Sequence, residues 1–503
     1  MFPTLLALHA LAAGTLPPAE IPQSVGVNIH FTRGHTQDLD LIAAAGFRWV
    51  RMDFSWSGTE RQRGEYDWGA YEELTDNLTQ RGLRALYILD YSSALYEEPV
   101  ATRDPVFGRE SRSPAAPRTP ESRAAFARWA AAAASHFRNR GVIWEVWNEP
   151  NIGFWRPQPS VEDYAALLSA TLTAVREADP SATIIGPASS EFPWTFLETL
   201  FRTPGILDRL DAVSVHPYRS GPPETVAPDY RRLRAQIEQH TPSARPPAPI
   251  LSGEWGYPTP EGGLSLSRQA AYVARQQLVN LLHGVPLSIW YDWKNDGIDP
   301  KEREHHFGTV THDLQPKPAY RGIQTLTRQL AGCRLVRRIE VDDAREYLLL
   351  LTDRAGSLRV AAWTTGAPHR LPTPIDLPRP EDVAIVDGQG QSRQPVSTNG
   401  FLALELDEAP QYISFRSAPQ FLRAAAAWRI VGSLATRAFA GTTNRLTATL
   451  ELRNPFDRPA RVVVRNHLLA PAEDATIPLD AGETRRHTVH WPLTRREREQ
   501  HPI

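Results

Sequence analysis

The order of apolar and polar positions divides the chain into two parts that meet near residue 332. Between residues 25 and 331, short apolar runs typical of buried strands alternate with longer segments in which apolar residues recur every three or four positions, as on one face of a helix. The strands that these runs predict are 25–30, 47–53, 83–90, 142–148, 182–187, 211–216, 249–254 and 286–292. The clearest helical segments between them are 38–45, 71–81, 122–138, 161–178 and 268–283.

Strand–helix units repeated in this way over about 300 residues are typical of a (β/α)8 barrel, an α/β fold that takes about 250 residues as one domain. The competing interpretation is a doubly wound open sheet. That sheet would carry a glycine-rich phosphate-binding turn after its first strand, whereas residues 28–34 contain a single glycine, Gly34. The pattern therefore favours a (β/α)8 TIM barrel over 21–332.

After Cys333 the pattern changes to an alternation of apolar and polar residues with period two. The strands predicted at 347–353, 358–365, 383–387, 401–406 and 411–415, with turn residues between them, indicate a small β-sandwich domain over 333–418. A second small all-β sandwich domain is predicted over 419–503, with strands near 445–452, 460–468 and 484–491. Its spacing is immunoglobulin-like, without the cysteine pair of antibody domains. The two domains could bind glycan or brace the barrel; because neither shows an obvious row of exposed aromatic residues, we expect bracing.

Residues 1–20 form a possible leader segment. The apolar run and Ala10-Leu11-Ala12 are similar to a signal-peptidase site, although no basic residue precedes the run and His9 interrupts it. This pattern predicts a secreted or periplasmic protein and leaves a cytoplasmic location open. No stretch approaches the ~20 apolar residues of a transmembrane helix, so we expect no membrane span.

Composition narrows the range of partners. The 503 residues include 55 basic and 57 acidic ones, a net charge of −2, so no strongly basic surface is indicated and no nucleic-acid partner is expected. A single cysteine, Cys333, excludes a disulfide framework and a zinc site built from cysteines. Lysine is rare, since only Lys294, Lys301 and Lys317 occur, which makes the position of each informative.

Polar side chains collect where the predicted barrel strands end, which is where the active sites of TIM barrels lie. Two of them, Glu149 after the fourth strand and Glu254 at the end of the seventh, would face each other across the barrel mouth. Cleavage of a glycosidic bond requires two such carboxyl groups, one protonated to release the leaving oxygen and one ionised to attack the anomeric carbon. The other strand-end residues are His30, Arg51, Asp53, Asp90, Asn148, His216, Tyr218, Trp290 and Asp292.

Asn148-Glu149-Pro150 and Gly253-Glu254-Trp255-Gly256 make the chain resemble clan A of the retaining glycoside hydrolases, families 39 and 5 in particular, over about residues 25–331. The resemblance implies that Glu149 is the acid/base and Glu254 the nucleophile. It also implies that Asn148 binds the sugar 2-hydroxyl and that Arg51 and Tyr218 act on Glu254, with His216 in the same wall of the site.

The resemblance further implies that Trp290 forms the apolar platform under the sugar. Asp90-Tyr91 stands where family 5 often has a histidine, and His30 would fill a similar role, as in family 39. Structural interpretations remain open for three of these residues: an Arg51–Asp53 ion pair, a core histidine at His216, and barrel packing by Trp290.

Two long loops bear on the substrate. Residues 91–120 are long enough for a functional lid. The loop 293–316 carries Lys294 close to the eighth strand, where its ammonium group would contact a sugar hydroxyl or carboxylate, although a solvated loop lysine is the alternative. Trp155, shortly after Glu149, would stack on the leaving-group sugar.

We therefore interpret the chain as a retaining glycoside hydrolase that cleaves β-glycosidic bonds of oligo- or polysaccharides by double displacement. It is expected to need no metal and no cofactor, to bind a carbohydrate substrate, and to be a monomer. The alternatives are a transglycosylase that uses the same site and a non-catalytic carbohydrate-binding protein on a degenerate barrel.

Overall fold

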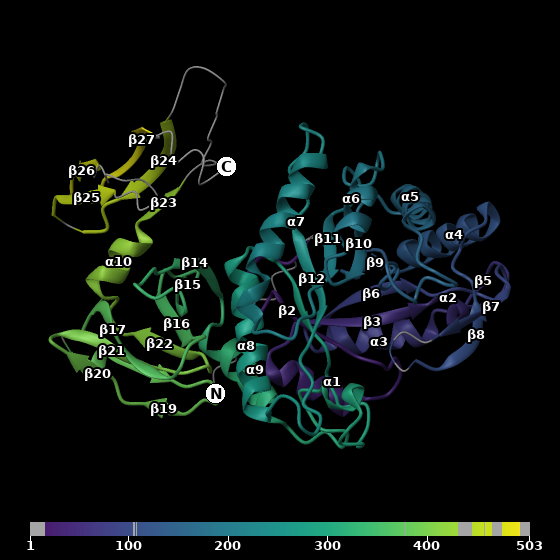
Figure 1. Ribbon diagram of the computed structural model, residues 1–503, viewed down its shortest axis with the longest axis horizontal. Coiled ribbons are helices and arrows are strands. Elements are labelled where there is room, and N and C mark those ends of the chain that lie inside the picture. The colour runs from purple at the N-terminus through teal and green to yellow at the C-terminus, as the bar shows by residue number, and fades with distance from the viewer. Residues whose placement is uncertain are drawn as a thin grey trace, which may run out of the picture.

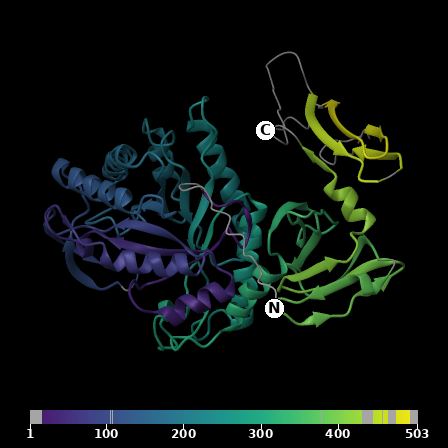
Figure 2. The same cartoon turned by 180° about the vertical axis from the view of Figure 1, so that it is seen from behind.

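The computed structural model describes residues 16–103, 106, 108–377, 379–430, 445–456, 458–464 and 475–492. Most of the predicted leader, residues 1–15, lies outside the described residues. A barrel surrounded by helices forms the larger part of the molecule, and two β units follow it on one side (Figure 1). Figure 2 shows from behind that the second β unit lies above the first. No described helix combines the length and the apolar character that crossing a bilayer requires.

The predicted (β/α)8 barrel is confirmed. Eight parallel strands close into a ring in the order β10-β11-β12-β13-β2-β3-β6-β9, which is their order along the chain. Each overlaps one predicted strand. Their bounds are β2 (Val25–Asn28), β3 (Trp49–Ser55), β6 (Arg84–Asp90), β9 (Ile143–Val146), β10 (Thr183–Ser190), β11 (Ala212–His216), β12 (Ile250–Trp255) and β13 (Ser288–Trp290).

Alternate residues of each strand point into the barrel, because successive side chains of a strand lie on opposite faces. Apolar side chains from all strands except β2 fill the interior: Trp49, Leu86, Ile88, Ile143, Ile185, Ala212, Leu251, Leu287 and Ile289. Two residues after Trp49 the inward position of β3 is Arg51, and two residues after Ile143 that of β9 is Glu145. The lower part of the barrel interior is therefore filled by apolar side chains, and the part nearer the mouth is polar.

The helices pack around the ring as α1 (Thr36–Ala45), α2 (Trp56–Thr59), α3 (Gly69–Gln80), α4 (Pro120–His136), α5 (Val161–Ala178), α6 (Trp194–Arg202), α7 (Ala227–His240), α8 (Leu266–Leu282) and α9 (Pro318–Gln329). α4 begins at a capping box, in which the Thr119 hydroxyl accepts from the Ser122 backbone and Pro120 occupies the first turn. The sequence pattern did not single out α6, α7 and α9. In α7 the buried face consists of only Tyr230, Leu233 and Ile237, among many charged residues.

The long loop after β6 is structured. It contains the antiparallel hairpin β7 (Pro99–Arg103) and β8 (Glu110–Pro114), within the segment 91–120 that the sequence predicted only as a long loop. A shorter hairpin, β4 (Glu60–Gln62) and β5 (Glu65–Tyr66), follows α2. The Tyr96 hydroxyl donates to Glu60 at 2.7 Å, so the two loops support each other.

The first β unit is a sandwich of a seven-stranded and a three-stranded sheet, ordered β1-β14-β15-β16-β22-β18-β19 and β17-β21-β20. Its edge strand β1 (Glu20–Ile21) comes from the start of the barrel region and pairs with β14, so this unit is not confined to 333–418. The other bounds are β14 (Cys333–Arg338), β15 (Glu346–Thr352), β16 (Leu358–Thr364), β17 (His369–Asp376), β18 (Val383–Val386), β19 (Ser392–Arg393), β20 (Val396–Thr398), β21 (Phe401–Leu406) and β22 (Gln411–Phe415).

A buried ion pair joins the sandwich to the barrel. Arg275 of α8 donates from Nε and Nη2 to both carboxylate oxygens of Glu224, at 2.8 and 2.6 Å, and the indole of Trp363 in β16 donates to the same carboxylate at 2.7 Å. Because a buried charge is tolerated only when it is paired and hydrogen-bonded, this contact requires all three side chains. It ties the sandwich to the helical layer of the barrel.

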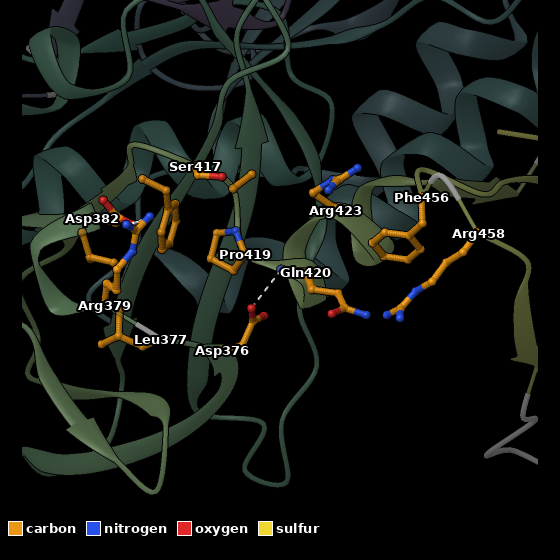
Figure 3. A pocket seen from close by; sticks show the side chains of 13 residues that line it. Asp376, Leu377, Arg379, Asp382, Ser417, Pro419, Gln420, Arg423, Phe456 and Arg458 are labelled. Carbon is orange, nitrogen blue, oxygen red and sulfur yellow. Dashed lines mark hydrogen bonds and ion pairs between the residues drawn. The ribbon is translucent and has the colours of Figure 1, made fainter. Parts of the chain in front are cut away.

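Helix α10 (Gln420–Ala426) leads to the second β unit, in which β23 (Trp428–Ile430), β24 (Arg445–Arg453) and β27 (Thr484–Pro492) form one sheet and β25 (Ala460–Val464) and β26 (Ala475–Leu479) another. A depression of about 390 Å³ lies at this junction, and Figure 3 shows the side chains that line it. Asp376 accepts the first backbone N–H groups of α10 there, and the Arg423 guanidinium lies over the Phe456 ring. The immunoglobulin-like topology stays a prediction, since 431–444 and 465–474 lie outside the described residues.

Candidate active site

Glu149 and Glu254 meet at the mouth of the barrel. Glu149 lies just beyond the fourth barrel strand, β9, and Glu254 lies on the seventh, β12. One carboxylate oxygen of each lies within 4.8 Å of the other, and their side chains are 9% and 14% exposed. Two carboxyl groups this close can act on opposite sides of one sugar atom.

The backbone that presents Glu149 is unusual. Trp147 and Glu149 have φ angles of 69° and 48°, in the left-handed region that non-glycine residues rarely adopt. The Glu149 backbone N–H donates to the Ala188 carbonyl at 3.0 Å, which fixes the turn against β10. Such conformations persist where the surrounding structure imposes them, often at functional sites.

Arg51 lies beneath the site and forms hydrogen bonds to several of its side chains. All five of its N–H donors point at acceptors, and the side chain is almost completely buried. Nε donates to Glu145 at 2.7 Å, which rules out the Arg51–Asp53 pair as its main contact. The remaining acceptors are Glu254 at 2.6 Å and Asn28 at 3.2 Å from Nη1, and Asn148 at 2.8 Å and His216 at 3.2 Å from Nη2.

Glu254 is held in its ionised form. Burial alone would raise its pKa, but the Arg51 guanidinium and the hydrogen bond that the Tyr218 hydroxyl donates at 2.8 Å outweigh burial and hold the pKa of Glu254 below its usual range. Because the carboxylate is charged yet partly desolvated, it has the character that a nucleophile needs.

His216 links Arg51 to Glu149. A guanidinium group can only donate, so Nε2 of His216 must accept from Arg51, and the ring proton must lie on Nδ1. Nδ1 then donates to Oε1 of Glu149 at 2.9 Å. His216 is fully buried, but these two contacts make it part of the site and not a core histidine.

Steric crowding explains why the residue before Glu254 is a glycine. A Cβ atom on Gly253 would lie 2.3 Å from Oγ of Ser214 and 3.0 Å from Oε1 of Glu145. Both distances are shorter than van der Waals contact, so only glycine lets β12 approach β9 and β11 here. The Gly253-Glu254 pair of the motif thus follows from the packing beneath the nucleophile position.

A second group of polar side chains lines the rim beside β2 and β13. Nε2 of His30 lies 3.2 Å from Oδ2 of Asp292, and the His30 side chain is 45% exposed. Burial would lower the pKa of His30, but Asp292 outweighs it and raises this pKa to about 9. Burial and Asp292 raise the pKa of Asp296 to about 6.

His30, Asp292 and Asp296 bring three possible metal ligands within 4.8 Å of one another, as do Glu149, His216 and Glu254. In each group the histidine already makes a hydrogen bond or an ion pair to a carboxylate. A cation would have to displace those contacts.

Two predicted sugar contacts are wrong. Trp290 is fully buried because it points outward from β13 into the helical layer, one position after the inward-facing Ile289. The next residue, the half-buried Tyr291, lies beside the site residues instead, with its ring 5.7 Å from His30 and 6.5 Å from Tyr218. Trp155 is also fully buried, with its ring 5.0 Å from Trp147, so it cannot stack on a sugar as the protein stands.

Asp90 and Lys294 differ from expectation as well. Asp90 points inward, but its carboxyl group is fully buried, which rules out direct substrate contact in this conformation. Burial and the neighbouring Asp53 raise the pKa of Asp90 well above its usual range, which favours its protonated form. Lys294 is mostly buried and lies 3.6 Å from Asp38 of α1, so its charge is paired within the protein.

Three further residues of the site were not predicted from the sequence: Glu145, Tyr91 and Tyr291. Glu145 is the single charged residue inside the apolar run 142–147, a signal for an inward-facing carboxylate that could have been used. Tyr91 accepts a hydrogen bond from Asn148 at 3.0 Å, a contact for which the sequence holds no signal.

The fold and the site together define a class: a (β/α)8 barrel with one glutamate after the fourth strand and one on the seventh is the arrangement of the clan A glycoside hydrolases. The sequence profile of Cellulase (glycosyl hydrolase family 5) matches residues 17–297, and the chain belongs to this family. The sequence-based resemblance to families 5 and 39 is confirmed by this match and by the structural neighbours.

A family 39 glycoside hydrolase from the gut symbiont Bacteroides cellulosilyticus WH2 matches with a TM-score of 0.68 and 26% identity, covering 80% of this chain and 83% of that one. A GH39 beta-xylosidase from Caulobacter crescentus has a TM-score of 0.57 at 18% identity, over 81% and 98% of the two chains, and supports the fold alone. A curated beta-xylosidase from Geobacillus stearothermophilus is 30% identical over 223 residues, which are 38% of this chain and 43% of that protein, less than half its length.

Proposed function

We propose that the protein is a retaining glycoside hydrolase that cleaves β-glycosidic bonds by double displacement. The observation that carries the proposal is the approach of the Glu149 and Glu254 carboxylates to within 4.8 Å. Retaining enzymes hold their carboxyl groups about 5–5.5 Å apart, whereas inverting enzymes leave about 6.5–9.5 Å for a water molecule. The short separation supports direct attack on the sugar.

In the first step, Glu254 attacks the anomeric carbon while Glu149 gives its proton to the departing glycosidic oxygen. The bond to the leaving group breaks as the bond to Oε of Glu254 forms. In the second step, Glu149 takes a proton from water, and that water displaces Glu254 with a second inversion. The sugar therefore leaves with its original β configuration.

The surrounding residues have roles that follow from their contacts. Arg51 and Tyr218 keep Glu254 ionised, through contacts of 2.6 and 2.8 Å. The Asn148 carbonyl oxygen is held by Arg51 and its amide by Tyr91, which leaves one amide N–H to bind the sugar 2-hydroxyl. Half-buried Tyr291 is the aromatic platform, and His30 and Asp292 face the sugar's remaining hydroxyl groups.

A neutral β-linked sugar is the substrate that we propose. Carboxylates outnumber cations around the opening, where Asp53, Asp292 and Asp296 accompany the two glutamates, and this charge disfavours an acidic glycone. The relative from Geobacillus stearothermophilus bears the name beta-xylosidase, so β-xylosides are the first substrates to test.

The experiment is turnover of a panel of aryl β-glycosides, followed by inactivation with the matching 2-deoxy-2-fluoro glycoside. A retaining enzyme should accumulate a covalent adduct, and peptide mass spectrometry should find it on Glu254. A product of inverted configuration, or an adduct on another residue, would contradict the proposal. Binding of sugars without turnover would instead favour a carbohydrate-binding protein.

We also propose that the protein is exported and acts as a monomer. The support for export is the apolar run before Ala10-Leu11-Ala12. N-terminal sequencing of protein from the periplasm or medium, and its mass by analytical ultracentrifugation, test these two statements. An unprocessed N-terminus on cytoplasmic protein, or a dimer mass, would contradict them.

A further inference from the structure

Beneath the two glutamates lies a third, Glu145, for which the proposed reaction has no direct use. It is fully buried on β9 and points inward, four residues before Glu149. Its Oε2 accepts from Nε of Arg51 at 2.7 Å, and its Oε1 accepts from the Ser214 hydroxyl at 2.5 Å. Both partners donate, so Glu145 is present as the carboxylate.

Arg51 therefore stands between two carboxylates. Glu145 contacts its Nε, and Glu254 contacts its Nη1 at 2.6 Å. A guanidinium group is planar, so a contact at Nε fixes the directions in which Nη1 and Nη2 donate. The orientation in which Arg51 meets Glu254, Asn148 and His216 thus depends on the position of Glu145.

The position of Glu145 is itself fixed by packing. The Ser214 hydroxyl holds Oε1, and the absent side chain of Gly253 leaves the space that both groups occupy. Three barrel strands, β9, β11 and β12, meet at this contact. The carboxylate cannot move away from Arg51 without breaking a buried hydrogen bond.

We propose that Glu145 is a positioning residue: its carboxylate fixes the plane of the Arg51 guanidinium and shares the positive charge of that group with Glu254. This inference rests on the proposed function, because it takes Glu254 as the nucleophile. Glu145 touches no substrate and acts through Arg51. Its negative charge opposes the ionisation of Glu254, so the basicity of the nucleophile is set by the balance of the two carboxylates.

Other charged and titratable groups also face this centre. These groups belong to the elements that pack against the centre. They are Arg51 and Asp53 of β3, Asp90 and Tyr91 at the end of β6, Glu149 after β9, Tyr164 of α5, His216 and Tyr218 at the end of β11, His30 after β2, Tyr291 and Asp292 after β13, and Asp296 and Glu304 in the following loop. Glu145→Gln leaves all of them in place and removes one charge.

In Glu145→Gln the amide oxygen still accepts from Arg51 and the amide nitrogen can donate to Ser214, so the shape is kept. Loss of the neighbouring negative charge favours the ionised form of Glu254. The acidic limb of kcat/KM against pH should therefore move to lower pH by about one unit. Glu145→Asp keeps the charge but shortens the reach, so kcat should fall about tenfold or more while the limb stays in place.

The matched control is Glu224→Gln, which neutralises another buried carboxylate, the one paired with Arg275 where the sandwich meets the barrel. It should lower Tm and leave the pH limbs unchanged. A Glu145→Gln profile that superimposes on the wild type, with only Tm lowered, would show a purely structural role and overturn the inference. If Glu145→Gln does not fold, Ser214→Ala serves as the second variant. In it kcat should fall several-fold at unchanged KM, and a wild-type kcat would overturn the inference.

Failure of the proposed function gives a different result. If Glu254→Gln retained wild-type turnover, the nucleophile assignment would be wrong. The positioning inference would then be read from the ¹³C carboxyl signal of Glu254, assigned by its absence from the Glu254→Gln spectrum. Glu145→Gln should shift the titration of that signal to lower pH, and an unshifted titration would overturn the inference without any assay of activity.

Discussion

His216 donates from Nδ1 to Oε1 of Glu149 at 2.9 Å, and its other ring nitrogen accepts from Arg51. The histidine therefore connects the side chain that orients the nucleophile position to the acid position. Because the guanidinium group can only donate, it fixes which ring nitrogen carries the proton, so His216 accepts from Arg51 and donates to Glu149.

Replacement of His216 should for this reason impair chemistry more than binding. In His216→Phe, Glu149 loses its donor and Arg51 one acceptor, so we expect kcat to fall about 100-fold with little change in KM. The loss should be larger for substrates with poor leaving groups, which depend on the proton of Glu149. His283→Asn, at the end of α8, is the control and should leave steady-state kinetics unchanged; equal effects of both substitutions would refute the role.

The aromatic platform is tested by a pair of neighbouring substitutions. Tyr291→Ala should lower kcat/KM about tenfold, mainly through KM, because a half-buried ring beside His30 is lost from the sugar site. Trp290→Phe should lower Tm by about 2–5 °C with unchanged kcat/KM, since Trp290 is buried in the helical layer. The reverse pattern in steady-state kinetics and thermal unfolding would restore Trp290 as the platform.

The alternation of residues explains both what the sequence predicted and what it did not. All eight barrel strands were predicted because apolar runs between helical segments leave little choice of fold. Trp290 was misplaced because both faces of the run 286–290 carry large apolar residues, Leu287 and Ile289 on one and Trp290 on the other, so the pattern does not tell the inward face of β13 from the outward one. In the structure Ile289 points into the barrel, so its neighbour Trp290 points outward.

The same reasoning applies to the polar residues. Glu149 and Glu254 could be predicted because each ends a strand within a recognisable motif. The contacts of Arg51 could not, because five acceptors reach it from β2, β9, the turn after β9, β11 and β12, which are distant in sequence. Trp155 likewise packs against Trp147, whose left-handed backbone conformation could not be predicted from the sequence.

Asp90 should make stability depend on pH. Its folded-state pKa is raised by burial and by Asp53, so folding is favoured at low pH, and this advantage is lost as the pH rises above the pKa of Asp90 in the unfolded chain. Asp90→Asn, which imitates the protonated acid, should match the wild-type Tm near pH 4 and exceed it by about 2–4 °C at pH 8. Thermal unfolding across this range is the measurement. The exposed Asp40→Asn should show no such trend, and a lower Tm of Asp90→Asn at pH 8 would mean that Asp90 is ionised.

The two glutamates should fail in different ways, and azide separates them. Glu149→Ala lacks the proton donor, which matters little for a dinitrophenyl leaving group, so the enzyme should be glycosylated rapidly and then stall, because nothing activates water. Azide needs no general base and should restart turnover, giving a β-glycosyl azide. Glu254→Ala lacks the nucleophile, so azide should attack the anomeric carbon directly and give the α-glycosyl azide. Product stereochemistry by proton NMR decides the matter: an α-azide from Glu149→Ala and a β-azide from Glu254→Ala would exchange the two roles.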